Sequence, residues 1–159
     1  MSPPTTPFNL KTTLQGILGA TMKSAVNAFL AGQGQEDYVY NAHSYLEVKS
    51  LVNNLSAPGT IHINPNDVAA FADTLNISYL SALKSVLVHE IGHAQYATSD
   101  LTAYSGDPAK MADWCYQREG EAAAFAFKVT TELVATGGYL SVAGPPSMPD
   151  LYSVMVAAV

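Results

Sequence analysis

The segment Ser85-Val86-Leu87-Val88-His89-Glu90-Ile91-Gly92-His93-Ala94-Gln95-Tyr96 contains the pattern His-Glu-x-x-His within an apolar stretch. Side chains four residues apart on an α-helix are stacked neighbours, about 5–6 Å apart at Cβ, so His89 and His93 can face one metal ion. Glu90 follows His89 by about 100° of helical rotation, which brings it within reach of a water on that ion. The pattern therefore predicts a helix with a metal site and a general base for hydrolysis.

The other interpretation of this segment is a buried helix whose histidines only pack or form hydrogen bonds, because short motifs also arise by chance. The surroundings favour the metal site, since polar side chains are costly among apolar ones unless they have partners. The apolar neighbours are Val86, Leu87, Val88, Ile91 and Ala94. A tetrahedral Zn²⁺ accepts two histidine nitrogens, and we expect Zn²⁺ as the cofactor.

The composition is typical of one compact domain. The chain has 159 residues, of which 48% are hydrophobic and 13% charged, enough to bury a substantial core. Seven Lys and Arg against thirteen Asp and Glu give a net charge of −6, which argues against binding of nucleic acid by a basic surface. We expect residues 1–8, which are rich in proline, to be a disordered segment or linker, and residues 9–159 to form a single domain.

Targeting signals in a sequence indicate where the protein is located in the cell, and the cysteine content limits the kinds of disulfide or metal site that it can form. No segment reaches the roughly 18–20 apolar residues of a membrane span, and the N-terminus lacks the basic region and apolar core of a signal peptide. We therefore expect a cytoplasmic protein, or one secreted by a route that needs no signal peptide. The single cysteine, Cys115, excludes an internal disulfide and a Cys-rich zinc ribbon. Its place on a predicted helix among apolar residues predicts a core position.

The hydrophobic periodicity predicts a mostly helical α+β fold with a small sheet beside the His-Glu-x-x-His helix. Residues 60–64 alternate in the manner of a strand, whereas residues 38–40 fit a short strand or a loop equally well. Predicted helices span about 9–31, 42–55, 66–75, 79–97, 108–136 and 150–159.

Helix boundaries and one glycine give further expectations. Asn66 is the predicted N-cap of the helix ending near 75, and either Asn76 or Ser78 caps the motif helix. Asp107 precedes a proline and so is the expected N-cap of the last long helix. Gly92 inside the motif helix costs about 1 kcal/mol relative to Ala, which predicts a close approach of another backbone there.

The strand at 61–64 has two interpretations. An exposed edge strand near a metal can bind an extended peptide by main-chain pairing, so we expect a protein or peptide substrate along 61–64. An ordinary strand within the sheet is the alternative. His62 on this strand is a distant candidate for the metal, although a solvent-facing histidine is the better interpretation.

A catalytic zinc with two histidines generally takes one more protein ligand and keeps a fourth position for water. Glu119 and Glu121 on the long helix that follows are the candidates. Two residues correspond to about 200° of helical rotation, so only one of them can face the ion. The apolar periodicity of the helix does not decide between them.

A resemblance to a known family bears on this choice. His89-Glu90-Ile91-Gly92-His93, followed by Glu121-Ala122-Ala123-Ala124-Phe125-Ala126, resembles the gluzincin pattern and is most similar to the ImmA/IrrE family of bacterial metallopeptidases. The resemblance implies a zincin-like fold with a strand just ahead of the motif helix, as at 61–65. It also implies that Glu121 is the third zinc ligand and that Glu119 lies beside the site or at the surface.

The predicted activity is that of a zinc metalloendopeptidase in which Glu90 takes the proton of the attacking water. Tyr96, Tyr104 and Tyr139 are candidate donors to the developing oxyanion, and the last two are favoured because they lie in loops beside the ligand helices. Carboxylates that orient the histidines are also expected, and Asp100 and Asp113 are the candidates.

Two other functions use the same residues. A zinc amidase acting on peptidoglycan or another non-protein amide would need the same metal site. A non-catalytic zinc-stabilised binding protein would need the histidines but not Glu90. Because small zincin-like domains also serve as bacterial effector toxins, the resemblance further implies a role as a toxin, with an immunity or regulatory protein as the partner.

Overall fold

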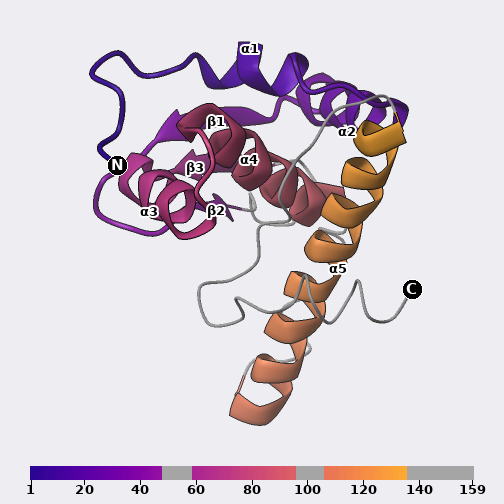
Figure 1. Ribbon diagram of the computed structural model, residues 1–159. Coiled ribbons are helices and arrows are strands. Elements are labelled where there is room, and N and C mark those ends of the chain that lie inside the picture. The colour runs from indigo at the N-terminus through magenta and orange to yellow at the C-terminus, as the bar shows by residue number, and fades with distance from the viewer. Residues whose placement is uncertain (48–58, 96–105, 136–159) are drawn as a thin grey trace.

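The computed structural model describes residues 1–47, 59–95 and 106–135, which form an α+β fold with a small sheet (Figure 1). This confirms the mostly helical fold class predicted from the sequence. The helices are α1 (Leu10–Gln15), α2 (Ala20–Ala31), α3 (Pro65–Leu75), α4 (Tyr79–Gln95) and α5 (Pro108–Ala135), and the strands are β1 (Gln35–Tyr38), β2 (Tyr45–Glu47) and β3 (Thr60–Ile63). None of these helices is long and apolar enough to cross a membrane. The predicted helix at 150–159 lies outside the described residues.

The first predicted helix, 9–31, is wrong as a continuous element, because the chain breaks between α1 and α2. Gly16 ends α1, and Gly19 precedes α2 with φ +104°, a conformation that favours glycine. The side chain of Asn9 caps α1 by accepting a 2.8 Å hydrogen bond from the backbone N–H of Thr12. Apolar residues continue across the break with helical spacing, which explains why periodicity alone missed it.

The sheet has the order β1-β3-β2, with β1 parallel and β2 antiparallel to β3. β1 ends at Tyr38, so within the segment 38–40 only Tyr38 lies in a strand, and residues 39 and 40 lie in the loop that follows. β2 falls within the predicted helix 42–55, and residues 42–44 before it are not helical either, so that prediction is wrong over 42–47. The rest of that predicted helix, from residue 48, lies outside the described residues.

β3 is the central strand, and its main-chain groups pair on both sides. The prediction of an exposed peptide-binding edge at 61–64 is therefore wrong for this strand. Ile61 and Ile63 are fully buried in the core, whereas His62 lies on the opposite face of the sheet. The edge nearer to the motif helix is β2, which contacts α4.

Side-chain caps fix the start of α3 and α4. Asn64, not Asn66, caps α3, because its Oδ1 accepts from the backbone N–H of Asn66 at 2.9 Å and Pro65 occupies the first helical position. Asn76 ends α3 in the left-handed conformation. Ser78 is the cap of α4, since its hydroxyl accepts from the backbone N–H of Ser81 at 3.1 Å.

The closest helix pair is α4 and α5, and Gly92 lies at their crossing. A Cβ at Gly92 would be 2.9 Å from both the Cα and the carbonyl oxygen of Ala122. This confirms the close backbone approach predicted for Gly92. Figure 1 shows α5 running past α4, with its first half extending beyond the other helices and the sheet. Cys115 lies on this extending half and is exposed, so its predicted core position is wrong.

Contacts near both ends of the described chain join these ends to the rest of the fold. Phe8, the last residue of the segment 1–8 predicted as disordered or a linker, contacts the domain: its ring stacks on Tyr79 with ring centroids 6.1 Å apart, and its carbonyl accepts from the Tyr38 hydroxyl at 2.8 Å. Near the end of α5, the carboxylate of Glu132 accepts hydrogen bonds from the backbone N–H of Thr21, at 3.0 Å, and from its hydroxyl. Glu132 therefore caps α2, whose own N-cap residue is Gly19.

Candidate metal centre

The two histidines of the motif lie one turn apart on α4 and face α5. Their rings meet edge to face with centroids 4.7 Å apart. Glu119 of α5 lies between them: its Oε2 is 3.1 Å from Nε2 of His89, and its Oε1 is 3.3 Å from Nε2 of His93. One ligand atom from each of the three residues lies within 4.8 Å of the others, which fits a single metal ion.

Burial differs across this site: the side chains of His93 and Glu119 are 14% and 31% exposed. His89 is 6% exposed and Glu90 is 4% exposed. Burial alone would raise the pKa of Glu119, but hydrogen bonds to His89 and His93 outweigh burial and hold that pKa well below its ordinary value. A carboxylate that stays ionised beside two imidazoles is a suitable ligand set for Zn²⁺.

The structure brings Glu119, not Glu121, to the histidines, which corrects the predicted third ligand. The Glu121 carboxylate instead accepts from Nε2 of Gln117 at 3.1 Å and lies 3.5 Å from Nη1 of Arg118. Ala122 marks the side of α5 that touches α4. Glu119 lies about 60° from that direction, whereas Glu121 lies about 100° away on the other side. The helix crossing therefore selects between the two carboxylates.

Arg118 is a functional candidate that the sequence interpretation did not assign to the site. Its side chain is buried, and Nη2 donates a 2.8 Å hydrogen bond to the backbone carbonyl of His93. Its guanidinium also lies 5.8 Å from the centre of the Trp114 ring. Arg118 thereby joins the last turn of α4 to α5 next to Glu119. Its presence on the otherwise apolar face of α5 is a sequence signal for such a role.

Glu90 lies beside the histidines with its carboxylate enclosed. Burial raises the pKa of Glu90, and the neighbouring His89 and His93 partly offset this effect. The backbone of Leu46 in β2 hydrogen-bonds the carboxylate. Its Oε2 has no hydrogen-bonding partner within the part of the chain that the structure describes. Such a buried acceptor is suited to a water molecule at the metal site.

The other predicted site residues either lie outside the described part of the chain or lie away from the histidine pair. Tyr96, Asp100, Tyr104 and Tyr139 lie outside the described residues. Asp113 is exposed on the extending half of α5. His62 has its Nδ1 against Asp37 and its Nε2 2.7 Å from Oε2 of Glu47, so neither ring nitrogen is free for the metal.

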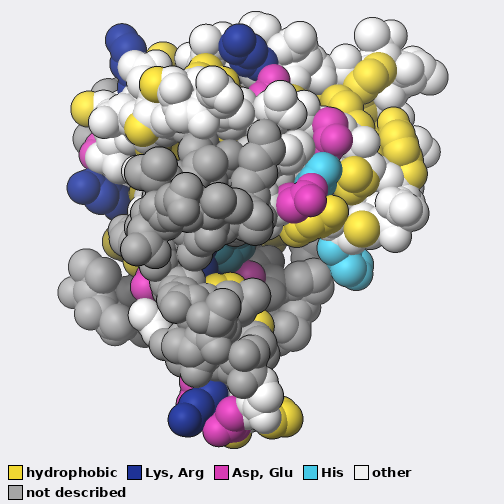
Figure 2. Space-filling view, turned by 180° about the vertical axis from the view of Figure 1, so that it is seen from behind, with side chains coloured by type: hydrophobic (Ala, Val, Ile, Leu, Met, Phe, Trp, Pro, Cys, Tyr) yellow, Lys and Arg dark blue, Asp and Glu magenta, His cyan; other side chains and the backbone are white. Residues whose placement is uncertain are grey.

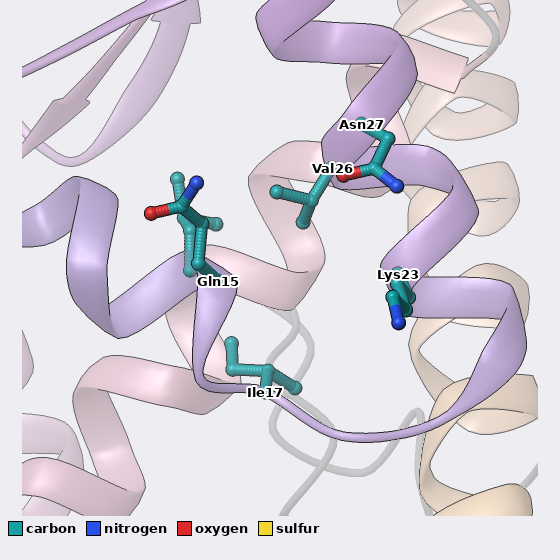
Figure 3. Close-up of a pocket in the computed structure, with 6 residues that line it drawn as sticks. Gln15, Ile17, Lys23, Val26 and Asn27 are labelled. Atoms are coloured by element: carbon teal, nitrogen blue, oxygen red, sulfur yellow. The ribbon is translucent and has the colours of Figure 1, made fainter.

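A separate hollow of about 220 Å³ lies where α1 meets α2 (Figure 3). It is lined by Leu14, Gln15, Ile17, Lys23, Val26 and Asn27. None of the three metal-site residues contributes to it. Among the described residues that line it there is neither a carboxylate nor a histidine, so it lacks the usual protein ligands of a divalent metal ion.

No protein-family model, curated protein or solved structure matches this chain. The similarity to the ImmA/IrrE family therefore remains a prediction from the motifs alone. The residue that this similarity favoured as third ligand, Glu121, is also not the one at the histidines. The geometry of the motif residues His89, Glu90 and His93 with Glu119 is therefore the basis for assigning a function.

Proposed function

We propose that the chain is a zinc-dependent endopeptidase with His89, His93 and Glu119 as metal ligands. The observation that carries this proposal is the position of the Glu119 carboxylate, whose two oxygens lie 3.1 and 3.3 Å from the Nε2 atoms of the two histidines. Two histidines and one carboxylate form a common ligand set of catalytic zinc, with a fourth position for water. A purely structural zinc site would generally have four protein ligands.

Zinc bound by these residues would lower the pKa of a water toward about 7 and polarise the carbonyl of the substrate. In the proposed reaction Glu90 accepts a proton from the water as its oxygen attacks the peptide carbon. The carbon–nitrogen bond then breaks, and Glu90 returns the proton to the leaving amine. The hydrogen bond from Leu46 orients the Glu90 carboxylate. Its Oε2, which has no hydrogen-bonding partner among the described residues, is the atom available for the proton.

The choice of third ligand is tested by a matched pair, Glu119→Gln and Glu121→Gln. Both changes remove one carboxylate from the same helix, but only Glu119 contacts the histidines. We expect the wild type and E121Q to bind about one Zn²⁺ per chain, and E119Q to bind it at least about tenfold more weakly. Zinc content after dialysis and chelator competition measure this. Loss of zinc from E121Q with retention by E119Q would overturn the assignment.

The role of Glu90 is tested separately with Glu90→Gln. This variant keeps the size of the side chain and all three ligands, so zinc binding should persist. Hydrolysis of casein should fall by about 10²–10⁴-fold, because the general base is lost. Wild-type hydrolysis by zinc-loaded E90Q would contradict the mechanism.

Parallel digestion of purified peptidoglycan distinguishes the alternative chemistry. Cleavage of peptidoglycan without cleavage of casein would indicate an amidase in place of an endopeptidase. A zinc-bound wild type that cleaves neither, and an E90Q variant with unchanged biological effect, would indicate a non-catalytic binding protein. The Glu119 and Glu121 comparison stays informative in all of these cases because it measures metal binding alone.

A further inference from the structure

A second group of ionisable side chains lies on the sheet, on the face opposite Ile61 and Ile63. We call it the His62 cluster, and it consists of Asp37, Tyr45, Glu47 and His62. Nδ1 of His62 contacts Oδ1 of Asp37 from β1, and Nε2 lies 2.7 Å from Oε2 of Glu47 from β2. The Tyr45 ring covers the imidazole with centroids 4.6 Å apart. The central strand is therefore joined by side chains to both of its neighbours.

Both ring nitrogens of His62 face carboxylate oxygens, which accept hydrogen bonds when ionised. A neutral imidazole donates from only one nitrogen, whereas an imidazolium donates from both. The arrangement is thus fully satisfied only when His62 is protonated. Deprotonation would leave one carboxylate facing a lone pair and would remove the positive charge between two negative ones.

The His62 cluster also lies next to the residue that orients Glu90. Tyr45 and Glu47 flank Leu46 in the short strand β2, and both contact His62. Leu46 itself faces the other way, where its side chain packs against the core and its backbone hydrogen-bonds Glu90. Whatever fixes Tyr45 and Glu47 therefore also fixes Leu46.

We propose that protonated His62 holds β2 against the central strand and thereby positions Glu90, so that His62 acts as a pH-dependent positioning residue. The first part of this inference concerns the fold alone. The second part, the effect on hydrolysis, rests on the proposed peptidase function.

Electrostatics support the protonated state over the neutral one. Burial lowers the pKa of His62, but hydrogen bonds to Glu47 and Asp37 outweigh it and raise the pKa above its ordinary value of 6.5. Among the described residues, the groups facing the imidazole are Asp37 from β1 and Tyr45 and Glu47 from β2. Figure 2 shows acidic side chains around a histidine at the surface. The two carboxylates are 53% and 61% exposed, so solvent moderates the interaction.

The sign of the pH effect follows from the raised pKa. The folded protein binds the His62 proton more tightly than the unfolded chain, so this contribution to stability is complete below pH 6.5. It is lost as the pH rises through the pKa of the folded protein. β2, and with it Leu46, should become less well held over the same interval.

The first experiment compares the full-length wild type with His62→Gln and His43→Gln. His43 is the matched control, because it also pairs with a carboxylate, Asp67 at 3.1 Å, but its side chain is 82% exposed and outside the cluster. Urea unfolding is measured from pH 5 to pH 9. We expect a decrease in stability with rising pH in the wild type and H43Q that is absent in H62Q. An identical pH dependence in wild type and H62Q would overturn the first part.

The second experiment follows the backbone amide of Leu46 by hydrogen exchange. H62Q should lower its protection factor by about tenfold, comparable to the loss of one net hydrogen bond, with protection in the middle of α4 unchanged. Glu47→Gln removes the negative charge of the β2 partner without altering the core, and it should lower the Leu46 protection factor in the same direction if H62Q does not fold. Unchanged Leu46 protection in E47Q would overturn the inference.

Hydrolysis gives the final readout. If the peptidase function holds, H62Q should lower kcat with KM and zinc content unchanged, and the loss should be smaller than that in E90Q. If no substrate is cleaved, the proposed function fails, while the stability and exchange measurements still test the His62 cluster. Full retention of kcat in H62Q, together with a loosened Leu46, would overturn the positioning of Glu90.

Discussion

Glu119 and Glu121 carry the same functional group two residues apart, yet only Glu119 contacts the histidine pair. Glu121 instead lies at the side of the helix and contacts Arg118, which in turn binds the carbonyl of His93. The two glutamates therefore have different surroundings: Glu119 faces His89 and His93, whereas Glu121 faces Arg118. The angular position of each residue around α5, relative to Ala122, determines which side chains it contacts.

At the residue scale, Arg118→Met tests whether this arginine supports the metal site. Methionine keeps much of the apolar stem but cannot donate to the His93 carbonyl, and the loss of a hydrogen bond from a charged group costs about 1.5–3 kcal/mol. We expect a lower free energy of unfolding and a zinc affinity reduced by about 10–100-fold, as for other residues that orient ligands. Urea unfolding and chelator competition measure the two effects.

Lys110→Met is the control for Arg118→Met, because it removes a positive charge from the exposed part of the same helix. It should leave zinc affinity unchanged. Equal zinc affinity in the two variants would show that Arg118 does not position the ligands.

At the element scale, local signals predicted most helix boundaries. Ser78 and Asp107 cap α4 and α5 through hydrogen bonds to backbone N–H groups two or three residues on, and such caps can be recognised in the sequence. The break between α1 and α2 and the strand β2 were missed, because apolar spacing in short segments fits more than one structure. The position of Glu119 beside the histidines was missed for another reason: the rotation of α5 against α4 depends on a contact between distant residues.

Gly92→Ala tests the helix crossing that sets this rotation. The added Cβ would meet the Ala122 backbone at 2.9 Å, so the helices must move apart. Overpacking typically costs about 1–3 kcal/mol, whereas alanine gains only about 1 kcal/mol in helix propensity. We expect the free energy of unfolding to fall by up to about 2 kcal/mol. Zinc binding should also weaken, because Glu119 moves away from the histidines.

Gly120→Ala is the matched control for the crossing. Gly120 is also helical, but a Cβ there would have nothing within 4 Å. Its substitution should stabilise the protein by up to about 1 kcal/mol without changing zinc affinity. Stabilisation by Gly92→Ala, with zinc affinity retained, would contradict the proposed importance of the close approach.

At the scale of the whole molecule, the position of Glu119 beside His89 and His93 depends on how α5 is held along its length. The helix extends beyond the domain at its first half, contacts α4 around Gly92 and reaches α2 through Glu132 near its end (Figure 1). Glu119 lies close to the point where α5 leaves the domain. The three residues of the candidate metal site thus come from two helices, and the Gly92 crossing, the Arg118 hydrogen bond and the Glu132 cap hold these helices in position.

Glu132→Gln tests the contribution of the distal contact to stability. Hydrogen bonds from Thr21 lower the pKa of Glu132, so the folded protein favours the ionised form. This contribution to stability is complete above the ordinary pKa of 4.5 and is lost as the pH falls through the lower pKa of the folded state. We expect E132Q to unfold at lower urea concentration than the wild type near pH 7, with the difference vanishing in acid. Asp113→Asn, which neutralises an exposed carboxylate elsewhere on α5, is the control, and an equal response of both variants would show that the cap of α2 adds nothing specific.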